Sequence, residues 1–211
     1  MNKRILGYLS WWRKRRVVHR LDIVESLLKD LEAIDPEHIA VTGDLTHLGL
    51  PEEFDQAAQW LTRLGPPDRV TVIPGNHEAY AGSKWHKNLS RWDPYLLSDD
   101  QQNLTQSGFF PSLRVRGQVA IISLCSARPS LPFLATGSLG QRQRHETARL
   151  LKETGEAGLL RVILIHHPPL SGTTKWRKRL VDGGAFSDIV RRYGAELVLH
   201  GHTHATTFGE L

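Results

Sequence analysis

The sequence has very little cysteine and no long apolar run. Cys125 is its only cysteine, so no disulfide can form within the chain. The longest apolar runs, residues 119–125 and 162–165, fall far short of the roughly 18 to 20 residues that span a bilayer. Basic residues follow the apolar start directly, and no small-residue cleavage site appears, which argues against a signal peptide. These absences together predict a cytoplasmic protein.

The composition is that of an ordinary globular chain. It has 211 residues, of which 40% are hydrophobic and 23% are charged, and this excludes a disordered, collagen-like or coiled-coil protein. We therefore expect residues 1–211 to form a single domain. No internal repeat and no interdomain linker is visible in the sequence.

Basic residues outnumber acidic ones by 27 to 22, and the excess lies mainly at residues 13–20 and 175–179. The first stretch is typical of a solvated helix face, and with Trp11 and Trp12 beside it an alternative is contact with an anionic membrane surface. A basic surface attracts anions in general and does not choose among nucleotides, phospholipids and nucleic acids. No feature of the sequence indicates an oligomeric state.

The first half of the chain predicts a strand, helix, strand unit. Apolar spacing of three and four residues predicts helices at 21–34 and 52–64. Short apolar runs at 39–42 and 70–73 predict strands, which such a unit pairs in parallel. We interpret residues 79–111, which lack a clear period, as a long and partly helical excursion.

The second half continues the alternation of strands and helices. Its predicted elements are strands at 119–124, 162–165 and 197–199, helices around 142–152 and 186–193, and a loop at 128–140. The fold class is therefore α/β with a mostly parallel arrangement.

Four of these strands run directly into polar residues of metal-binding type. The four groups are Gly43-Asp44, Gly75-Asn76-His77-Glu78, His166-His167 and Gly201-His202-Thr203-His204. Loops at the carboxyl ends of parallel strands share one edge of the sheet, so these distant groups are expected to converge. Carboxylate, amide and imidazole ligands suit Mn²⁺, Fe, Zn²⁺, Co²⁺ or Ni²⁺.

The order Gly-Asp, Gly-Asn-His-Glu, His-His-Pro-Pro and Gly-His-Thr-His resembles the calcineurin-like metallophosphoesterase family. The resemblance covers residues 39–204. It implies a four-layer fold, in which a double β-sheet sandwich is flanked by helices. It also implies a phosphoesterase that hydrolyses phosphomonoester or phosphodiester bonds by a hydroxide that two divalent metal ions activate.

The resemblance also implies roles for individual residues. Asp44 bridges the two metal ions. Asn76, His166 and His202 complete the shell of the second ion, and His204 belongs to the first.

His77 stays unligated in this scheme and acts as a general acid at the leaving group, with Glu78 or a neighbouring carboxylate orienting it. Among the other histidines, His167 is left unassigned and His200 is expected to pack or to hydrogen-bond. Five more are interpreted as surface or structural: His19, His38, His47, His86 and His145.

One departure from the family pattern concerns the first metal ion. The family begins with Asp-x-His on its first strand, and no such triplet precedes Gly43 here. We therefore expect this domain to lack its first strand and its C-terminal strands. In that case the first metal ion keeps only Asp44 and His204. The alternative function is a catalytically impaired metal-binding or anion-binding remnant, which docks to nucleic acid or membrane through its basic stretches.

The second basic stretch follows the His-His-Pro-Pro group by a short loop. Lys175, Arg177 and Arg179 are candidates for binding substrate phosphate, because arginine can grip phosphate oxygens in a bidentate manner. A solubilising turn is an equally weighted interpretation. The sequence names neither the substrate nor the metal.

Overall fold

The computed structural model describes residues 21–80, 82, 85–100 and 110–211. Trp11, Trp12 and the basic stretch at 13–20 lie outside these residues. No helix in the described ranges combines the length and the apolar character needed to cross a membrane.

The order of elements confirms the predicted α/β alternation. The first part contains α2 (Leu21–Ile34), β1 (Ile39–Val41), α3 (Pro51–Leu64) and β2 (Val70–Val72), followed by α4 (Trp85–Leu89), η2 (Ser90–Trp92) and α5 (Asp93–Leu96). The second part contains β3 (Ser112–Arg116), β4 (Val119–Ser123), α6 (Gly140–Glu156), β5 (Leu160–Ile165), η4 (Trp176–Lys178), α7 (Gly183–Tyr193) and β6 (Leu197–His200).

Two sheets form the centre of the structure. Strands β1 and β2 pair in parallel, as predicted, and a second sheet has the order β3-β4-β5-β6. Within the second sheet β4, β5 and β6 are parallel, whereas β3 and β4 form an antiparallel hairpin. Strand β3 has no counterpart among the elements that the sequence predicts.

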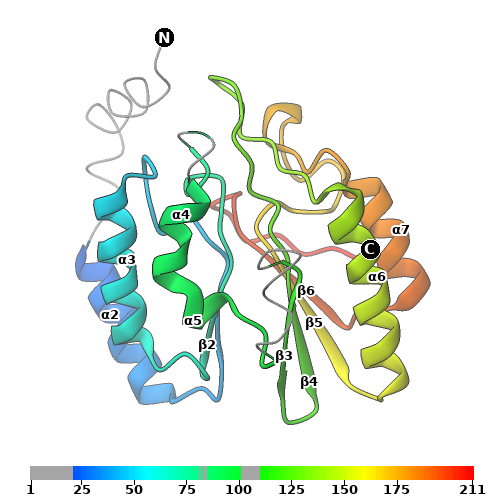
Figure 1. Ribbon diagram of the computed structural model, residues 1–211, viewed down its shortest axis with the longest axis horizontal. Coiled ribbons are helices and arrows are strands. Elements are labelled where there is room, and N and C mark those ends of the chain that lie inside the picture. The colour runs from blue at the N-terminus through cyan, green and yellow to red at the C-terminus, as the bar shows by residue number, and fades with distance from the viewer. Residues whose placement is uncertain (1–20, 81, 83–84, 101–109) are drawn as a thin grey trace.

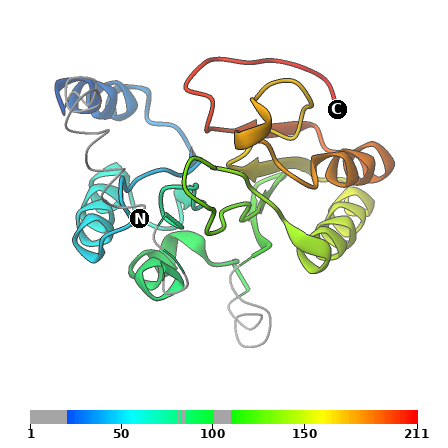
Figure 2. The same ribbon diagram turned by 90° about the horizontal axis from the view of Figure 1, so that it is seen from above.

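Helices cover the outer side of each sheet, so the described elements stack as helix, sheet, sheet and helix. Figures 1 and 2 show α2 and α3 on one side of the molecule and α6 and α7 on the other. One core joins Phe54 and Leu61 of α3 to Val72 and also to Ile121 and Leu164 of the second sheet.

A second core fills the space between the second sheet and its helices. It contains Ile122 and Ile163, the neighbours of Ile121 and Leu164, together with Leu151 of α6 and Phe186 of α7. Successive residues of a strand point to opposite faces, so β4 and β5 contribute to both cores. The carboxyl ends of β1, β2, β5 and β6 are thereby fixed close to one another, and the predicted metal ligands follow these ends.

Candidate metal centre

Glycines allow the loops after β1 and β2 to touch. Gly43 has a φ of 93°, and a Cβ added there would collide with the backbone of Gly75. A Cβ on Gly75 would in turn lie 2.7 Å from Cε1 of His166. Only glycine permits this approach of the two backbones to each other and to the His166 ring.

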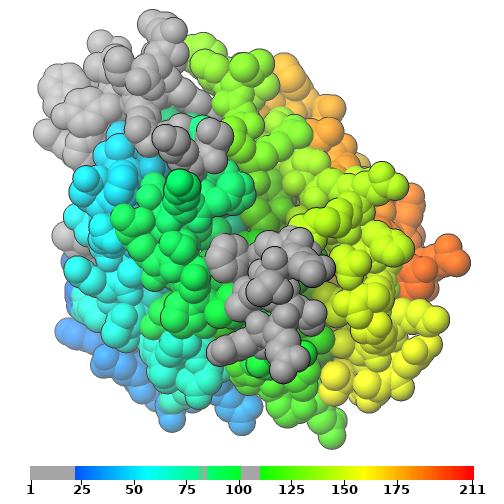
Figure 3. All heavy atoms as spheres, in the orientation of Figure 1, coloured from blue at the N-terminus to red at the C-terminus, as the bar shows by residue number. Residues whose placement is uncertain are grey.

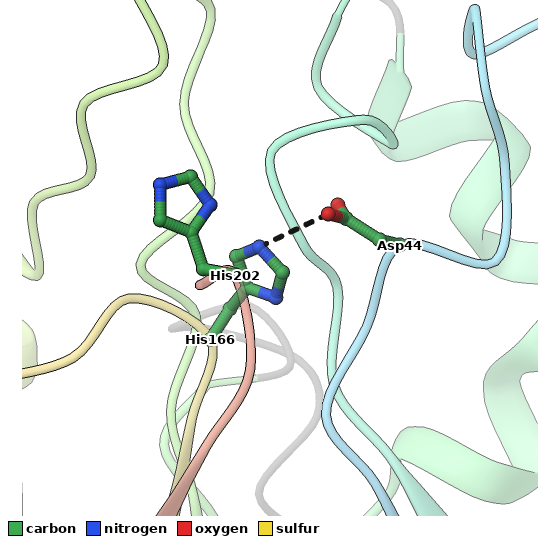
Figure 4. Close-up of side chains that lie close together, drawn as sticks. All are labelled: Asp44, His166 and His202. Atoms are coloured by element: carbon green, nitrogen blue, oxygen red, sulfur yellow. Dashed lines mark ion pairs between the residues drawn. The ribbon is translucent and has the colours of Figure 1, made fainter. Parts of the chain in front are cut away.

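The structure brings Asp44, His166 and His202 together from both sheets (Figure 4). Asp44 follows β1, His166 follows β5 and His202 follows β6, and one potential ligand atom from each lies within 4.8 Å of the others. Asp44 and His202 have φ values of 63° and 70°. Non-glycine residues in this left-handed region are uncommon and gather at functional sites.

The ring of His166 is oriented by the backbone. Its Nδ1 lies 2.6 Å from the carbonyl oxygen of Thr42, so Nδ1–H donates there and Nε2 faces the cluster. Two oxygens approach this Nε2, Asn76 Oδ1 at 3.2 Å and Asp44 Oδ2 at 3.3 Å. A ring nitrogen between two acceptor oxygens requires a cation, either a proton or a metal ion.

The protonation states of Asp44 and His166 favour a cation between these two side chains. Burial raises the pKa of Asp44, but the hydrogen bond to His166 and the charge of its ring outweigh burial, so the pKa lies well below its usual value. Burial lowers the pKa of His166, but the Asp44 carboxylate outweighs it and the net shift is upward. The carboxylate is therefore ionised and holds positive charge on its partner.

His202 has the properties of a neutral ligand. Burial, together with the positive charge of His166, lowers the pKa of His202 to about 4, so its ring is neutral at pH 7. Its Nε2 is buried and has no hydrogen-bond partner among the described residues. A buried ring nitrogen in this state costs free energy unless a ligand satisfies it. His202 Nε2, together with Asp44, Asn76 and His166, therefore forms a set of donor atoms that fits a divalent ion of the Mn, Fe or Zn type.

His204 is not part of the cluster of Asp44, His166 and His202. It follows β6 by a few residues with a φ of 55°, and its side chain is exposed. Its ring lies outside the group of ligand atoms that meet within 4.8 Å. The four predicted ligands of the second ion thus converge in the structure.

His77 lies next to the cluster, and a backbone carbonyl orients its ring. Nδ1 of His77 is 2.6 Å from the carbonyl oxygen of His47, and the backbone N–H of His77 donates to Asp44 Oδ1 at 3.0 Å. The rings of His47 and Tyr80 stack against it, with centroids 5.4 and 5.6 Å away. Because Nδ1–H is held by the carbonyl, Nε2 is the atom available to exchange a proton with a substrate.

Of the two expected partners of His77, Glu78 or a neighbouring carboxylate, Glu78 instead binds the backbone of two loops, whereas Asp44 accepts the His77 backbone N–H. The Glu78 carboxylate is fully buried and accepts three backbone N–H groups: Asp44 at 2.9 Å, Thr46 at 2.8 Å and Gly75 at 2.6 Å. Burial, followed by the charge of Asp44, raises its pKa. Glu78 therefore ties the loop after β1 to the loop after β2, and orientation of His77 comes from His47.

His47 positions His77, and the sequence gives no specific signal for this contact. The sequence favours a surface or structural role for His47, and its carbonyl and its ring both contact His77. The contact through the carbonyl could be made by any residue, so no residue-type signal marks it. Its position three residues after Asp44 is the only hint in the sequence.

The second basic stretch lies beside the cluster. Lys175, Arg177 and Arg179 are exposed on the loop around η4. Backbone hydrogen bonds join this loop to the loop at 128–140, which contacts His167, and the ring centroid of His167 lies 4.5 Å from that of His202. His167, which the sequence analysis left unassigned, is buried, with Nδ1 2.7 Å from Ser126 Oγ and Nε2 3.2 Å from the Ala135 carbonyl oxygen. It therefore connects the strand end that carries His166 to the loop at 128–140.

We predict that Glu78→Gln weakens metal binding about 10- to 100-fold, because neutral glutamine cannot hold three N–H groups as a carboxylate does. Titration calorimetry with Mn²⁺ measures this. Glu53→Gln is the matched control, since Glu53 accepts the backbone N–H groups of His47, Leu48 and Leu50 on the same loop but does not touch Gly75. The control should lose stability and keep its metal affinity. Equal metal affinity in both variants would contradict the assigned role.

The fold and the cluster together define an α/β protein with a group of possible metal ligands where the strands of two sheets end. The chain belongs to the calcineurin-like phosphoesterase family, whose sequence model matches residues 17–206. It is also 27% identical over 184 residues to a protein of Synechococcus sp. (strain ATCC 27144) named "Probable cyclic nucleotide phosphodiesterase". The match covers 83% of this chain and 60% of the length of that relative.

Proposed function

We propose that the protein is a phosphoesterase that hydrolyses phosphomonoester or phosphodiester bonds with two divalent metal ions. The convergence of Asp44, Asn76, His166 and His202 at one edge of the sheets supports this most strongly. These four residues would hold one ion, and Asp44 with His204 would contribute to the other. Divalent ions bound there supply an activated water and offset the negative charge of the phosphate.

The residues of the chain would perform the remaining steps. His77 would donate a proton from Nε2 to the leaving oxygen, since its Nδ1 is committed to the His47 carbonyl. Lys175, Arg177 and Arg179 would bind the phosphate oxygens from the exposed loop beside the cluster. Their positive charges support this role, as does their position on the loop around η4, which is hydrogen-bonded to the loop that contacts His167.

The similarity to the Synechococcus protein supports a phosphodiester rather than a monoester as the first substrate class to examine. Cyclic nucleotides belong to that class. We further propose a cytoplasmic location, on the ground that the chain has a single cysteine. Burial raises the pKa of Cys125 to about 12, so its thiol stays protonated and takes no part as a nucleophile.

Hydrolysis of bis(p-nitrophenyl) phosphate by the whole chain tests the proposal. The protein is freed of metal with a chelator and then assayed before and after addition of Mn²⁺, Zn²⁺ or Mg²⁺. We expect activity only with added metal, with Mn²⁺ or Zn²⁺ above Mg²⁺, because imidazole ligands favour the former. Folded protein that binds Mn²⁺ but hydrolyses nothing would favour the metal-binding remnant instead.

A further inference from the structure

Two loops beside the metal centre form a single raised structure, which we call the loop ridge. It consists of residues 128–139 and 171–181. Three backbone hydrogen bonds join the two loops: Ala135 N–H to Arg177 O at 2.9 Å, Gly137 N–H to Arg179 O at 3.1 Å and Val181 N–H to Gly137 O at 2.9 Å. Figures 1 and 3 show both loops projecting together at one end of the molecule.

The tips of the loop ridge expose large apolar side chains. Leu131 is 72% exposed, Phe133 78% and Trp176 65%. The first tip is held in shape by a tight turn, in which the Leu134 N–H donates to Leu131 O and Ser130 Oγ donates to Leu134 O. Phe133 has a φ of 67°, an uncommon conformation for a bulky residue. Apolar side chains gathered on an ordered surface of this kind mark an interaction site.

The loop ridge is also basic without any acidic residue. Its cations are Arg128, Lys175, Arg177, Lys178 and Arg179, and neither segment contains aspartate or glutamate. The nearest carboxylate in sequence, Asp182, is directed to the start of α6, where it accepts the N–H groups of Leu139 and Gly140. The surface is therefore complementary to an anionic partner.

We propose that the loop ridge docks the protein on an anionic phospholipid bilayer. Leu131, Phe133 and Trp176 enter the interfacial layer, and the basic side chains reach the headgroup phosphates. An aliphatic side chain such as that of Leu131 is stabilised in the apolar part of a bilayer, whereas it cannot stack on nucleic-acid bases. The exposed Leu131 therefore favours lipid over nucleic acid as the partner. Because the Ala135 carbonyl of the loop ridge contacts His167, whose ring centroid lies 4.5 Å from that of His202, docking brings the metal centre next to the membrane surface.

Co-sedimentation of the whole chain with vesicles tests the proposal and needs no hydrolysis, so its outcome is separate from that of the proposed function. The probes are vesicles of phosphatidylcholine alone and vesicles with about 30% phosphatidylserine. We expect binding to the anionic vesicles at least about tenfold stronger than to the neutral ones, since each basic residue contributes roughly fivefold.

The double variant Leu131→Ser/Phe133→Ser should bind anionic vesicles about tenfold or more weakly while hydrolysing a water-soluble diester at the wild-type rate. Ile34→Ser is the matched control, because Ile34 is 71% exposed at the end of α2, ahead of the start of β1 at the opposite end of the strands. It should bind as the wild type does. Three results would each overturn the proposal: equal binding to both vesicle types, unchanged binding by the double variant, or displacement of the vesicles by a short single-stranded DNA.

Discussion

Asp44→Ala is expected to remove bound metal and hydrolysis together. Asp44 is the one carboxylate in the cluster, and its charge holds a cation against the rings of His166 and His202. Without it, a divalent ion would meet only neutral ligands, and we expect metal affinity to fall by about 100-fold or more. Hydrolysis should fall by at least the same factor at limiting metal.

Metal content after dialysis against low Mn²⁺, measured by mass spectrometry, and the rate of diester hydrolysis check this prediction. Asp55→Ala is the control, because Asp55 is an exposed aspartate of α3 whose ion pair with Arg91 lies away from the cluster. Wild-type metal content in Asp44→Ala would show that the ion is held elsewhere.

His77→Ala is expected to lower turnover by about 10² to 10⁴ while leaving metal content unchanged. The His77 ring lies beside the cluster, but its Nδ1 is bonded to the His47 carbonyl and its contact with Asp44 runs through its backbone N–H. Alanine retains that N–H, so Asp44 keeps its position. A lost proton donor slows the chemical step without weakening the metal site.

The choice of leaving group makes this prediction sharper. A p-nitrophenolate leaves without a proton, whereas an alkoxide needs one, so the defect of His77→Ala should be much larger for an alkyl ester. His145→Ala is the control, since His145 is an exposed residue of α6. Loss of metal in His77→Ala, or an equal defect for both leaving groups, would contradict the role of a general acid.

Periodicity in the sequence predicted most helices and strands correctly. Helix α2 has the predicted limits, and the parallel pairing of β1 with β2 follows from the helix between them. Strand β3 was missed because its pattern is not that of an apolar strand. Its Arg114 is buried, and the guanidinium donates to four backbone carbonyls, including those of Leu97 and Val70. Such contacts come from distant loops and leave no local signal in the sequence.

The sequence predicts the side chains that meet in the candidate site, but it does not predict the contacts that these side chains make with backbone groups. Strand ends followed by Asp44, Asn76, His166 and His202 pointed to one edge, and the structure brings these four together. The partner of His77 is a backbone carbonyl, and the partners of Glu78 are backbone amides. Every residue has a backbone carbonyl and every residue except proline has a backbone N–H, so the use of these groups depends on the path of the chain and hardly on residue type.

Anomalous diffraction from crystals grown with Mn²⁺ tests the central claim most directly. The account predicts an anomalous peak about 2.0 to 2.3 Å from Asp44 Oδ2, Asn76 Oδ1, His166 Nε2 and His202 Nε2. A crystal in which these four atoms surround no peak, at a Mn²⁺ concentration that supports hydrolysis, would contradict it.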